Sequence, residues 1–198
     1  MPFHSFTPDR DGWKTVADET AFANAHLEVH RVTLTSPTRS KPFPWTVCYR
    51  KGAVVVAPQR ADGSFILVRQ ERVPIRATIW ELPAGQIDDV TEHDEAAIHA
   101  TGLRELREES GYQLGPESEI ISLGHFFPSP GFTDEHSHLL LVRPVILSPL
   151  GTSLDANEAI SEARAFTPDA LRAMIATGEI SDANTLAAFA RLTARGLI

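Results

Sequence analysis

Three glutamates, Glu105, Glu108 and Glu109, are close together in the segment GLRELREESGY, residues 102–112. On an α-helix their i, i+3 and i+4 spacing places all three carboxylates on one side. Mg²⁺ prefers oxygen ligands, and one or two carboxylates with water and substrate phosphates make a typical site. Glu105 and Glu109, one turn apart, therefore form half of a candidate metal site. A solvated surface helix with i,i+4 ion pairs would show the same pattern.

A helix has to carry these glutamates, and the flanking residues indicate its boundaries. Thr91 and Asp94 resemble an N-terminal capping signal, and Gly111 suits the left-handed residue that often ends a helix. We therefore predict a helix over residues 91–110. The preceding segment ELPAG, residues 81–85, ends a predicted strand with a Pro-Ala-Gly turn. The glutamate helix thus follows a strand and a turn.

The rest of the chain alternates predicted strands and helices. Apolar runs and alternating patterns predict strands at residues 25–35, 45–58, 64–72, 78–85, 119–127 and 136–147. Pro- and Ser-rich residues 36–44 predict a loop, and the turn at residues 61–63 predicts a hairpin. Capping residues and terminal glycines predict helices over 167–178 and 181–196. This order indicates an α+β fold with mixed sheets sandwiched between helices, in which residues 1–44 form a β appendage and residues 45–198 the main domain.

The composition argues against several classes of protein. The 198 residues fit one ordinary domain, and the apolar share of 42% supports a buried core. The 18 basic and 26 acidic residues give a formal net charge of −8, which disfavours non-specific binding to nucleic acid or anionic membranes. A single cysteine, Cys48, excludes an internal disulfide and a thiolate zinc cluster. No signal-peptide pattern or membrane-spanning apolar run is present, so we expect a cytoplasmic protein.

The turn and the glutamate helix together resemble the Nudix box. That box is a glycine-led loop followed by a helix reading R-E-apolar-x-E-E-x-G-apolar, as in LPAGQID and RELREESGY. The matching positions of its second half are Arg104, Glu105, Leu106, Glu108, Glu109, Gly111 and Tyr112. The resemblance implies a Nudix fold whose glutamates hold a divalent metal and which hydrolyses a nucleoside diphosphate linked to another group.

The lead-in to the helix departs from the family pattern. Nineteen positions separate Gly85 from Arg104 (104 − 85), about five more than in the family. Ala96 stands where the family has a glutamate. Glu92 and Glu95 are the candidates to replace that glutamate. The departure concerns the outer part of the metal site rather than the pair of glutamates one turn apart.

Three further segments resemble the ADP-ribose pyrophosphatase branch of the family. They are VRQERVPIRATIWELPAG, PSPGFTDE and TGEISDANTLAAFARL, so that the resemblance covers about residues 45–192. By position, it implies metal ligands at the backbone carbonyl of Ala84 and at Glu105 and Glu109. It implies catalytic roles for Glu108, Glu109 and a late-loop glutamate, Glu158 in preference to Glu162. It implies substrate contacts from Trp45, Arg50, Arg72, Pro128 and Glu135.

The reaction implied by the resemblance is hydrolysis of ADP-ribose to AMP and ribose 5-phosphate by a homodimer that uses Mg²⁺ or Mn²⁺. Another nucleoside diphosphate sugar, such as UDP-glucose or GDP-mannose, is an alternative substrate. A non-catalytic binding module on the same scaffold is a second alternative, against which the retained glutamates argue. Arg50 and Arg72 could also be ordinary surface residues, and Trp45 could be a core or dimer contact.

Overall fold

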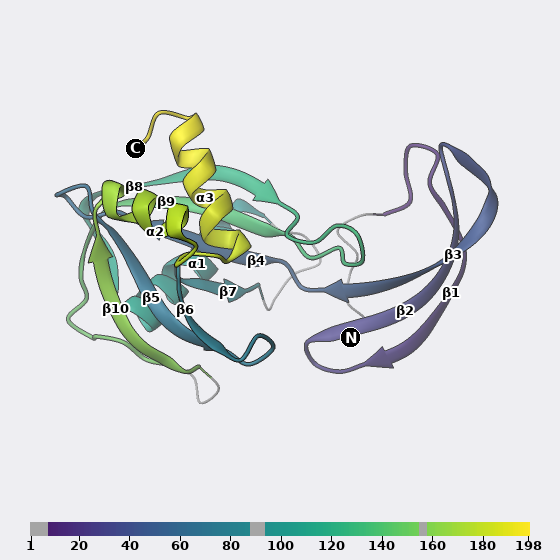
Figure 1. Ribbon diagram of the computed structural model, residues 1–198, viewed down its shortest axis with the longest axis horizontal. Coiled ribbons are helices and arrows are strands. Elements are labelled where there is room, and N and C mark those ends of the chain that lie inside the picture. The colour runs from purple at the N-terminus through teal and green to yellow at the C-terminus, as the bar shows by residue number, and fades with distance from the viewer. Residues whose placement is uncertain (1–7, 88–93, 155–157) are drawn as a thin grey trace. The chain divides into compact units, whose positions relative to one another are not determined.

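The chain forms two compact units, which we describe separately. In the computed structural model the described residues are 8–87, 94–154 and 158–198. Unit 1 contains the described residues up to Gly52 together with Phe127–His136. Unit 2 contains the described residues of Ala53–Phe126 and Ser137–Ile198. Figure 1 shows the first three strands in unit 1 and all three helices in unit 2.

Unit 1 is built on an antiparallel sheet in the order β1-β2-β3, formed by Lys14–Ala23, Leu27–Ser36 and Arg39–Arg50. The loop predicted for residues 36–44 is therefore wrong, because β3 begins directly after a short turn. Its prolines, Pro42 and Pro44, are tolerated because β3 is an edge strand of this sheet and needs no N–H there. The domain boundary after residue 44 stays a prediction. The strand β3 runs through that position without a break.

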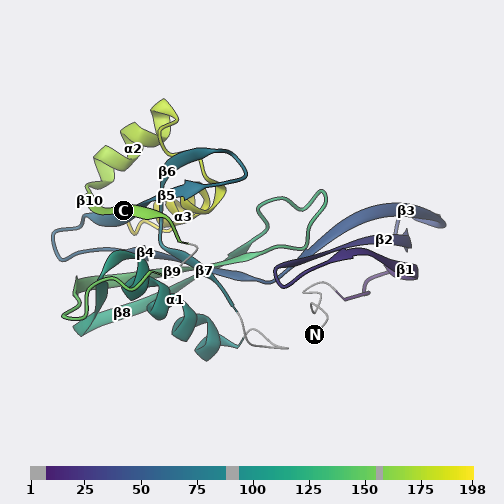
Figure 2. The same cartoon turned by 90° about the horizontal axis from the view of Figure 1, so that it is seen from below.

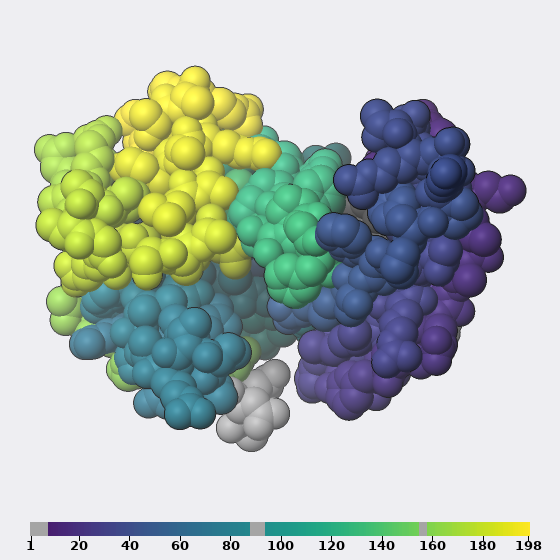
Figure 3. All heavy atoms as spheres, turned by 45° about the vertical axis from the view of Figure 1, so that its right-hand side comes forward, coloured from purple at the N-terminus to yellow at the C-terminus, as the bar shows by residue number. Residues whose placement is uncertain are grey.

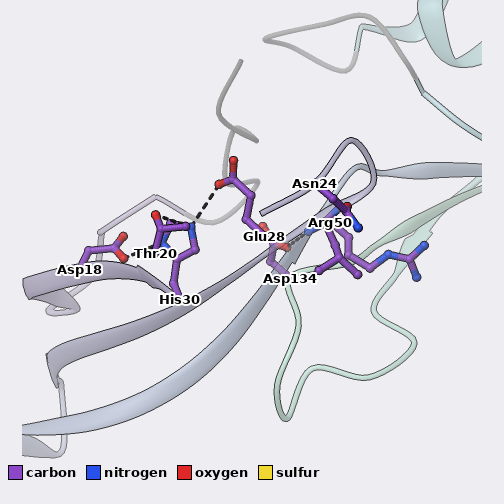
Figure 4. A network of polar contacts seen from close by, with 8 residues as sticks. Asp18, Thr20, Asn24, Glu28, His30, Arg50 and Asp134 are labelled. Carbon is purple, nitrogen blue, oxygen red and sulfur yellow. Dashed lines mark hydrogen bonds and ion pairs between the residues drawn. The ribbon is translucent and has the colours of Figure 1, made fainter. Parts of the chain in front are cut away.

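A histidine between two carboxylates joins β1 to β2 (Figure 4). The Nδ1 atom of His30 lies 2.6 Å from Asp18 Oδ1, and its Nε2 atom lies 3.1 Å from Glu28 Oε2. The ring of Tyr49 meets the His30 ring edge-on, with the centroids 4.9 Å apart. Burial opposes protonation, but the hydrogen bonds to Asp18 and Glu28 outweigh it and raise the pKa of His30 above 6.5.

This arrangement predicts that His30 stabilises the protein more at low pH than at high pH. A raised pKa means that its contribution is complete below pH 6.5 and is lost as the pH rises through the folded-state value. We expect His30→Asn to lower the free energy of unfolding by about 0.5–1 kcal/mol near pH 6, as for partly screened ion pairs. The loss should be smaller near pH 9. Urea denaturation of both proteins at the two pH values checks this, and an equal loss at both would contradict it.

Unit 2 contains two further sheets and three helices. One sheet has the order β7-β4-β9-β8 and the other the order β10-β5-β6. The strands are β4 (Ala53–Pro58), β5 (Phe65–Arg72), β6 (Ala77–Glu81), β7 (Ala84–Gln86), β8 (Tyr112–Phe126), β9 (Ser137–Leu147) and β10 (Ile160–Phe166). The helices are α1 (Glu95–Ser110), α2 (Pro168–Thr177) and α3 (Ala183–Ala194). In the described parts of the chain, no helix combines the length and the apolar character needed to cross a bilayer.

The hairpin predicted around residues 61–63 is wrong, because β4 and β5 belong to different sheets. The turn exists, and it is closed by the isolated bridge Gln59↔Phe65 and by short-range bonds such as that from the N–H of Arg60 to the carbonyl of Ser64 at 2.8 Å. β4 instead pairs in parallel with β9 and antiparallel with β7. β5 pairs with β6 and β10. The uninterrupted apolar run Val54–Ala57 fits a strand that is covered on both faces rather than a two-stranded hairpin.

Alternate residues of β4 and β9 belong to two different core clusters. Figure 2 shows α1 on one side of β4 and β9, and α2 and α3 on the other. Figure 3 shows the side chains of α2 and α3 lying against those of the β5–β6 region. The residues that share one cluster with α2 and α3 include Val55, Ala57, Leu139, Leu141, Leu171, Met174, Ala188 and Leu192. The residues that share the other cluster with α1 include Val54, Val56, Ile66, Leu106, Leu140 and Val142. The sheet that contains β4 and β9 thus lies between helices, as predicted from the sequence.

Helix α1 begins at Glu95, four residues later than predicted. Asp94 is its N-cap, and its side chain accepts a hydrogen bond from the backbone N–H of Ala97 at 2.7 Å. Gly111 ends the helix in the left-handed conformation with φ of 73°. A glycine inside a helix usually costs about 1 kcal/mol. Here Gly102 lets α1 approach the sheet, because a Cβ atom at this position would lie 2.9 Å from a side-chain atom of Leu140.

Candidate active site

Helix α1 buries Glu105 and Glu109 in unit 2 and leaves Glu108 partly exposed. Leu106 is fully buried and fixes the rotation of the helix, so that Glu105 and Glu109 on the same side are also buried. Glu108 is held by two arginines. Its Oε2 atom accepts from Arg104 at 2.9 Å and its Oε1 atom from Arg107 at 2.6 Å. The solvated-helix alternative therefore describes Glu108 but not the buried pair.

The Pro-Ala-Gly turn lies directly against the two buried glutamates. The backbone N–H of Ala84 donates to Glu109 Oε2 at 2.8 Å. A Cβ atom at Gly85 would overlap the carboxylate of Glu105, so only glycine leaves room for it. Pairing of β7 with β4 fixes this turn, since Ala84 is opposite Val55 in the register. The sheet thus positions the Ala84–Gly85 peptide beside the carboxylates.

A third carboxylate reaches the same place from the segment before β10. β10 is antiparallel to β5 with Ile160 opposite Gln70, and the N–H of Glu71 donates to the carbonyl of Ala159. Continuing that register by two residues places Glu158 opposite Arg72. Oxygen atoms of Glu105, Glu109 and Glu158 all lie within 4.8 Å of one another. Three carboxylates from distant parts of the sequence therefore form one cluster, which we call the carboxylate cluster.

Burial makes this cluster unfavourable for negative charge. Burial raises the pKa of Glu105 to about 7, and neighbouring Glu158 adds to this effect while Arg104 opposes it. Burial raises the pKa of Glu109 to about 8, where the N–H of Ala84 and the charge of Arg72 oppose the shift. Like charges held together in a desolvated place need a compensating cation. A divalent ion would supply that charge.

The carboxylate cluster fits a hard divalent cation by its donor set and by its shape. All three donors are carboxylate oxygens, which Mg²⁺ and Mn²⁺ prefer over nitrogen or sulfur. The missing side chain at Gly85 keeps the Glu105 carboxylate in place beside the Ala84 peptide. Arg72 and Arg104 lower part of the repulsion in the absence of an ion. The residues present can therefore hold the metal that the sequence predicted.

This electrostatic arrangement predicts a pH-dependent stabilisation by metal. Without metal, the folded state retains protons on Glu105 and Glu109 that the unfolded chain has lost, so stability falls as the pH rises from about 4.5 through 7 and 8. Mg²⁺ at a hundred times its dissociation constant should add about 2.7 kcal/mol. We expect an increase in Tm of about 5–10 °C at pH 8.5 and a smaller one at pH 6.

Scanning calorimetry in EDTA or Mg²⁺ at both pH values measures this difference. The control Glu119→Gln changes a surface glutamate that is 2.8 Å from Arg143, and it should behave as the wild type. A Glu105→Gln/Glu109→Gln variant should gain little from Mg²⁺. Equal stabilisation of that variant would show that the metal binds elsewhere.

Arg72 lies in the same unit as the carboxylate cluster, at the end of β5. Its Nε and Nη2 atoms donate to the two oxygens of buried Glu81, at 2.8 and 2.6 Å. Its charge is close enough to Glu109 to lower the pKa of that carboxyl. The structure thus brings together five residues predicted for the site, namely Arg72, Ala84, Glu105, Glu109 and Glu158.

Four of the predicted substrate contacts belong to unit 1. Arg50 Nη1 lies 2.7 Å from Glu135 Oε1, so these two candidates form an ion pair with each other. The indole N–H of Trp45 donates to the carbonyl of Gly131 at 3.3 Å. Pro128 is half-buried in the segment between β8 and β9. The backbone N–H of Arg50 donates to a carboxylate of the same segment at residue 134, and Figure 4 shows the Arg50 guanidinium directed away from His30.

A groove of about 860 Å³ lies on unit 1, and six aromatic side chains line it together with polar and aliphatic residues. Its aromatic residues are Trp13, Phe43, Trp45, Tyr49, Phe127 and Phe132. Trp45 is 48% exposed and can therefore be contacted by a planar ring. Stacking on such side chains is favourable for any nucleobase.

Other candidates lie away from the carboxylate cluster. Glu162 pairs with Arg164, at 2.7 Å between Oε1 and Nε, rather than with the other glutamates. Glu95 is the first residue of α1 with an 81% exposed side chain, 3.8 Å from His99. Glu92 lies outside the described residues. Glu95 therefore does not take the place of the glutamate that the family has at the position of Ala96.

The sequence did not single out Glu81, and it did not give the structural reason for Gly85. Glu81 was read only as part of a strand, although a carboxylate between Trp80 and Leu82 in an apolar strand is unusual and needs a partner. The sequence marks Gly85 as the leading glycine of the box, and the structure adds that this glycine leaves space for Glu105. The unusual carboxylate in an apolar strand could have pointed to Glu81 from the sequence. The space that Gly85 leaves for Glu105 depends on a tertiary contact and could not.

Comparison with known proteins gives a consistent relationship. Residues 49–189 match the model of the NUDIX domain. The ADP-ribose pyrophosphatase of Bacillus subtilis (strain 168) is 31% identical over 172 residues, covering 87% of this chain and 88% of the relative. The methanol dehydrogenase activator of Bacillus methanolicus is 30% identical over 177 residues, covering 88% and 89%. A crystal structure of an ADP compounds hydrolase matches the fold with a TM-score of 0.75 at 16% identity, covering 97% of this chain and 100% of that one.

Proposed function

This chain belongs to the Nudix family of hydrolases, and we propose that it hydrolyses the pyrophosphate of ADP-ribose to AMP and ribose 5-phosphate with the help of a divalent metal. The observation that carries the proposal is the carboxylate cluster beside the Ala84–Gly85 peptide. It combines buried oxygen donors from α1 with a glutamate from a distant segment. This is the donor set needed to bring a cation to a phosphate.

The chemistry assigned to these residues follows from their charge and burial. Glu105, Glu109, Glu158 and the carbonyl of Ala84 would hold Mg²⁺ or Mn²⁺, which supplies positive charge to the pyrophosphate and makes a nearby water more acidic. The oxygen of that water bonds to one phosphorus, and the bond from that phosphorus to the bridging oxygen breaks. Glu158, the least buried of the three glutamates, accepts the proton of the water.

Two further residues of unit 2 support these groups. Arg72 donates hydrogen bonds to the pyrophosphate oxygens, as a guanidinium binds phosphate with a fixed geometry. Glu108 holds Arg104 and Arg107 through ion pairs, and Arg104 in turn contacts Glu105 at 2.6 Å. Glu108 therefore supports the cluster through the arginines. Its catalytic role is indirect in this arrangement.

ADP-ribose is the preferred substrate in this proposal because of what one relative is named for. The Bacillus subtilis relative, which aligns with most of the chain, is named an ADP-ribose pyrophosphatase. UDP-glucose and GDP-mannose would share the pyrophosphate chemistry but present a different base and sugar.

We also propose that the protein is a homodimer. β1 is an edge strand in which every residue is exposed, including Val16 and Phe22, which are 53% and 54% exposed. Such an edge is suited to contact with a second copy. Light scattering after size exclusion should give twice the chain mass, and Val16→Lys/Phe22→Lys should shift the protein to monomer. A wild-type mass of one chain would contradict this.

A substrate panel tests the proposed function. The purified protein is incubated with ADP-ribose, UDP-glucose, GDP-mannose or NADH in Mg²⁺ or Mn²⁺, and the products are separated by chromatography. We expect AMP and ribose 5-phosphate in equal amounts from ADP-ribose, with the highest kcat/KM of the panel. Preference for another sugar nucleotide would overturn the substrate, and no hydrolysis of any of them would overturn the activity.

A further inference from the structure

Arg72 is held by a bidentate ion pair with Glu81. Glu81 accepts from Nε and from Nη2 of the guanidinium, at 2.8 and 2.6 Å, so the two planar groups meet along one edge. The Glu81 side chain is 4% exposed, while that of Arg72 is 38% exposed. The buried carboxylate of Glu81 is therefore hydrogen-bonded to one edge of the Arg72 guanidinium, and Glu81 makes no hydrogen bond with Nη1.

The strand register directs this pair toward the carboxylate cluster. Arg72 is opposite Ala77, and Glu81 is opposite Val68, so both side chains lie on the same face of the β5–β6 hairpin. Ile66 shares that face of β5 and packs in the same cluster as Leu106 of α1. Phe65 and Leu67, on the other face, pack with α2 and α3. Arg72 thus extends from the face that looks toward α1, and its charge acts on Glu109.

Glu81 is fixed in turn by the first turn of α3. The backbone N–H of Leu82 donates to Thr185 Oγ1 at 3.0 Å, although the two residues are 103 positions apart. Asp182, the N-cap of α3, accepts from the N–H of Thr185 at 2.8 Å. Its charge also acts on Glu81 and Arg72. Helix α3 therefore holds the strand that carries Glu81, so the position of Arg72 is determined by the fold of unit 2.

We propose that Glu81 is a positioning residue for catalysis, which holds the Arg72 guanidinium so that its Nη1 edge meets the substrate pyrophosphate. This inference rests on the proposed function and adds a residue to it. A surface arginine of this length would otherwise sample many rotamers and lose entropy on binding phosphate. Fixing one edge of the guanidinium beforehand removes most of that loss and sets the direction of the remaining N–H groups.

A double-mutant cycle on kcat/KM for ADP-ribose in Mg²⁺ tests the inference. Its members are the wild type, Glu81→Gln, Arg72→Ala and the double variant. Glutamine keeps the shape of Glu81 but removes its charge and one of its two acceptors. We expect Glu81→Gln to lower kcat/KM roughly 10- to 100-fold, the range for a misplaced binding group. In the Arg72→Ala background the same change should have an effect within about twofold.

Two controls separate positioning from damage to the fold. Glu119→Gln removes a carboxylate that also accepts from an arginine Nε atom, at 2.8 Å from Arg143, and should leave kcat/KM unchanged. The Tm of each variant reports on folding. If Glu81→Gln does not fold, Glu81→Asp replaces it in both backgrounds, since aspartate keeps the charge but is too short for both hydrogen bonds. Its loss of kcat/KM should likewise depend on Arg72.

The outcomes distinguish this inference from the proposed function. An active wild type whose loss on Glu81→Gln disappears without Arg72 supports the inference. If the wild type is active and the losses of kcat/KM from the two substitutions multiply in the double variant, the inference alone is overturned. Glu81 would then act through the fold and not through Arg72. A wild type that hydrolyses no sugar nucleotide overturns the proposed function and this inference with it.

Discussion

Glu109→Gln is expected to lower kcat for ADP-ribose by roughly a thousandfold while the protein stays folded. Glu109 is 2% exposed and is one of the three glutamates of the carboxylate cluster, so in the variant bulk water has little access to take the place of the lost oxygen ligand. Glutamine resembles the protonated carboxyl, which burial already favours because it raises the pKa of Glu109 to about 8. It can also keep the hydrogen bond from the N–H of Ala84. Tm in EDTA should therefore be unchanged or higher.

Steady-state kinetics with saturating Mg²⁺ and calorimetry in EDTA measure the two parts of this prediction. Glu119→Gln removes one carboxylate from the surface of the same unit and controls for the loss of charge. Activity of Glu109→Gln within tenfold of the wild type would place the reaction elsewhere. A large fall in Tm would mean that Glu109 acts mainly in folding.

Gly85→Ala should be nearly as harmful to activity, although it adds only a methyl group. The new Cβ atom would overlap the carboxylate of Glu105, whose flexible side chain must then turn away from the cluster. Because the nearest atoms all belong to the side chain of Glu105 and none to the backbone, the fold should survive. A displaced ligand of this kind is expected to lower kcat/KM by about 100-fold or more.

Mg²⁺ titration followed by calorimetry should show a weakened site in Gly85→Ala. Gly115→Ala is a suitable control, because the nearest atoms to its added methyl all belong to Ile146, away from the carboxylate cluster. A partial return of activity in Gly85→Ala/Glu105→Asp would confirm that the overlap is the cause. Wild-type activity of Gly85→Ala would show that the close approach of the turn to α1 is not needed.

Helix α1 was the most predictable part of the site, because its signals are local. Gly111 ended the helix as predicted, and the spacing of Glu105 and Glu109 put both on one face with Leu106. The start was placed too early, since Asp94 rather than Thr91 precedes the first turn. Local patterns therefore indicated which carboxylates lie together, and the i,i+4 spacing of Arg104 and Glu108 also fits their ion pair, whereas the contact of Glu108 with Arg107 comes from the structure.

The pairing of distant segments could not be predicted from local patterns. The turn after β4 looks like a hairpin, yet β4 is completed by β9 and β7, which lie far along the chain. β3 accepts Pro42 and Pro44 because it is an edge strand, a property of the sheet and not of the residues. The meeting of Glu158 with α1 likewise depends on the β10–β5 register. The family resemblance predicted Glu158 as a site residue, and the strand register explains why it lies there.

The most direct test of the metal site follows Mn²⁺ binding and hydrolysis in the same sample. Metal is removed with EDTA, Mn²⁺ is added back, and bound ion is measured by electron paramagnetic resonance while AMP release from ADP-ribose is recorded. We predict that activity rises in proportion to bound Mn²⁺, and that Glu105→Gln/Glu109→Gln/Glu158→Gln neither binds the ion tightly nor releases AMP. Hydrolysis without bound metal, or unchanged Mn²⁺ binding in the triple variant, would contradict the assignment.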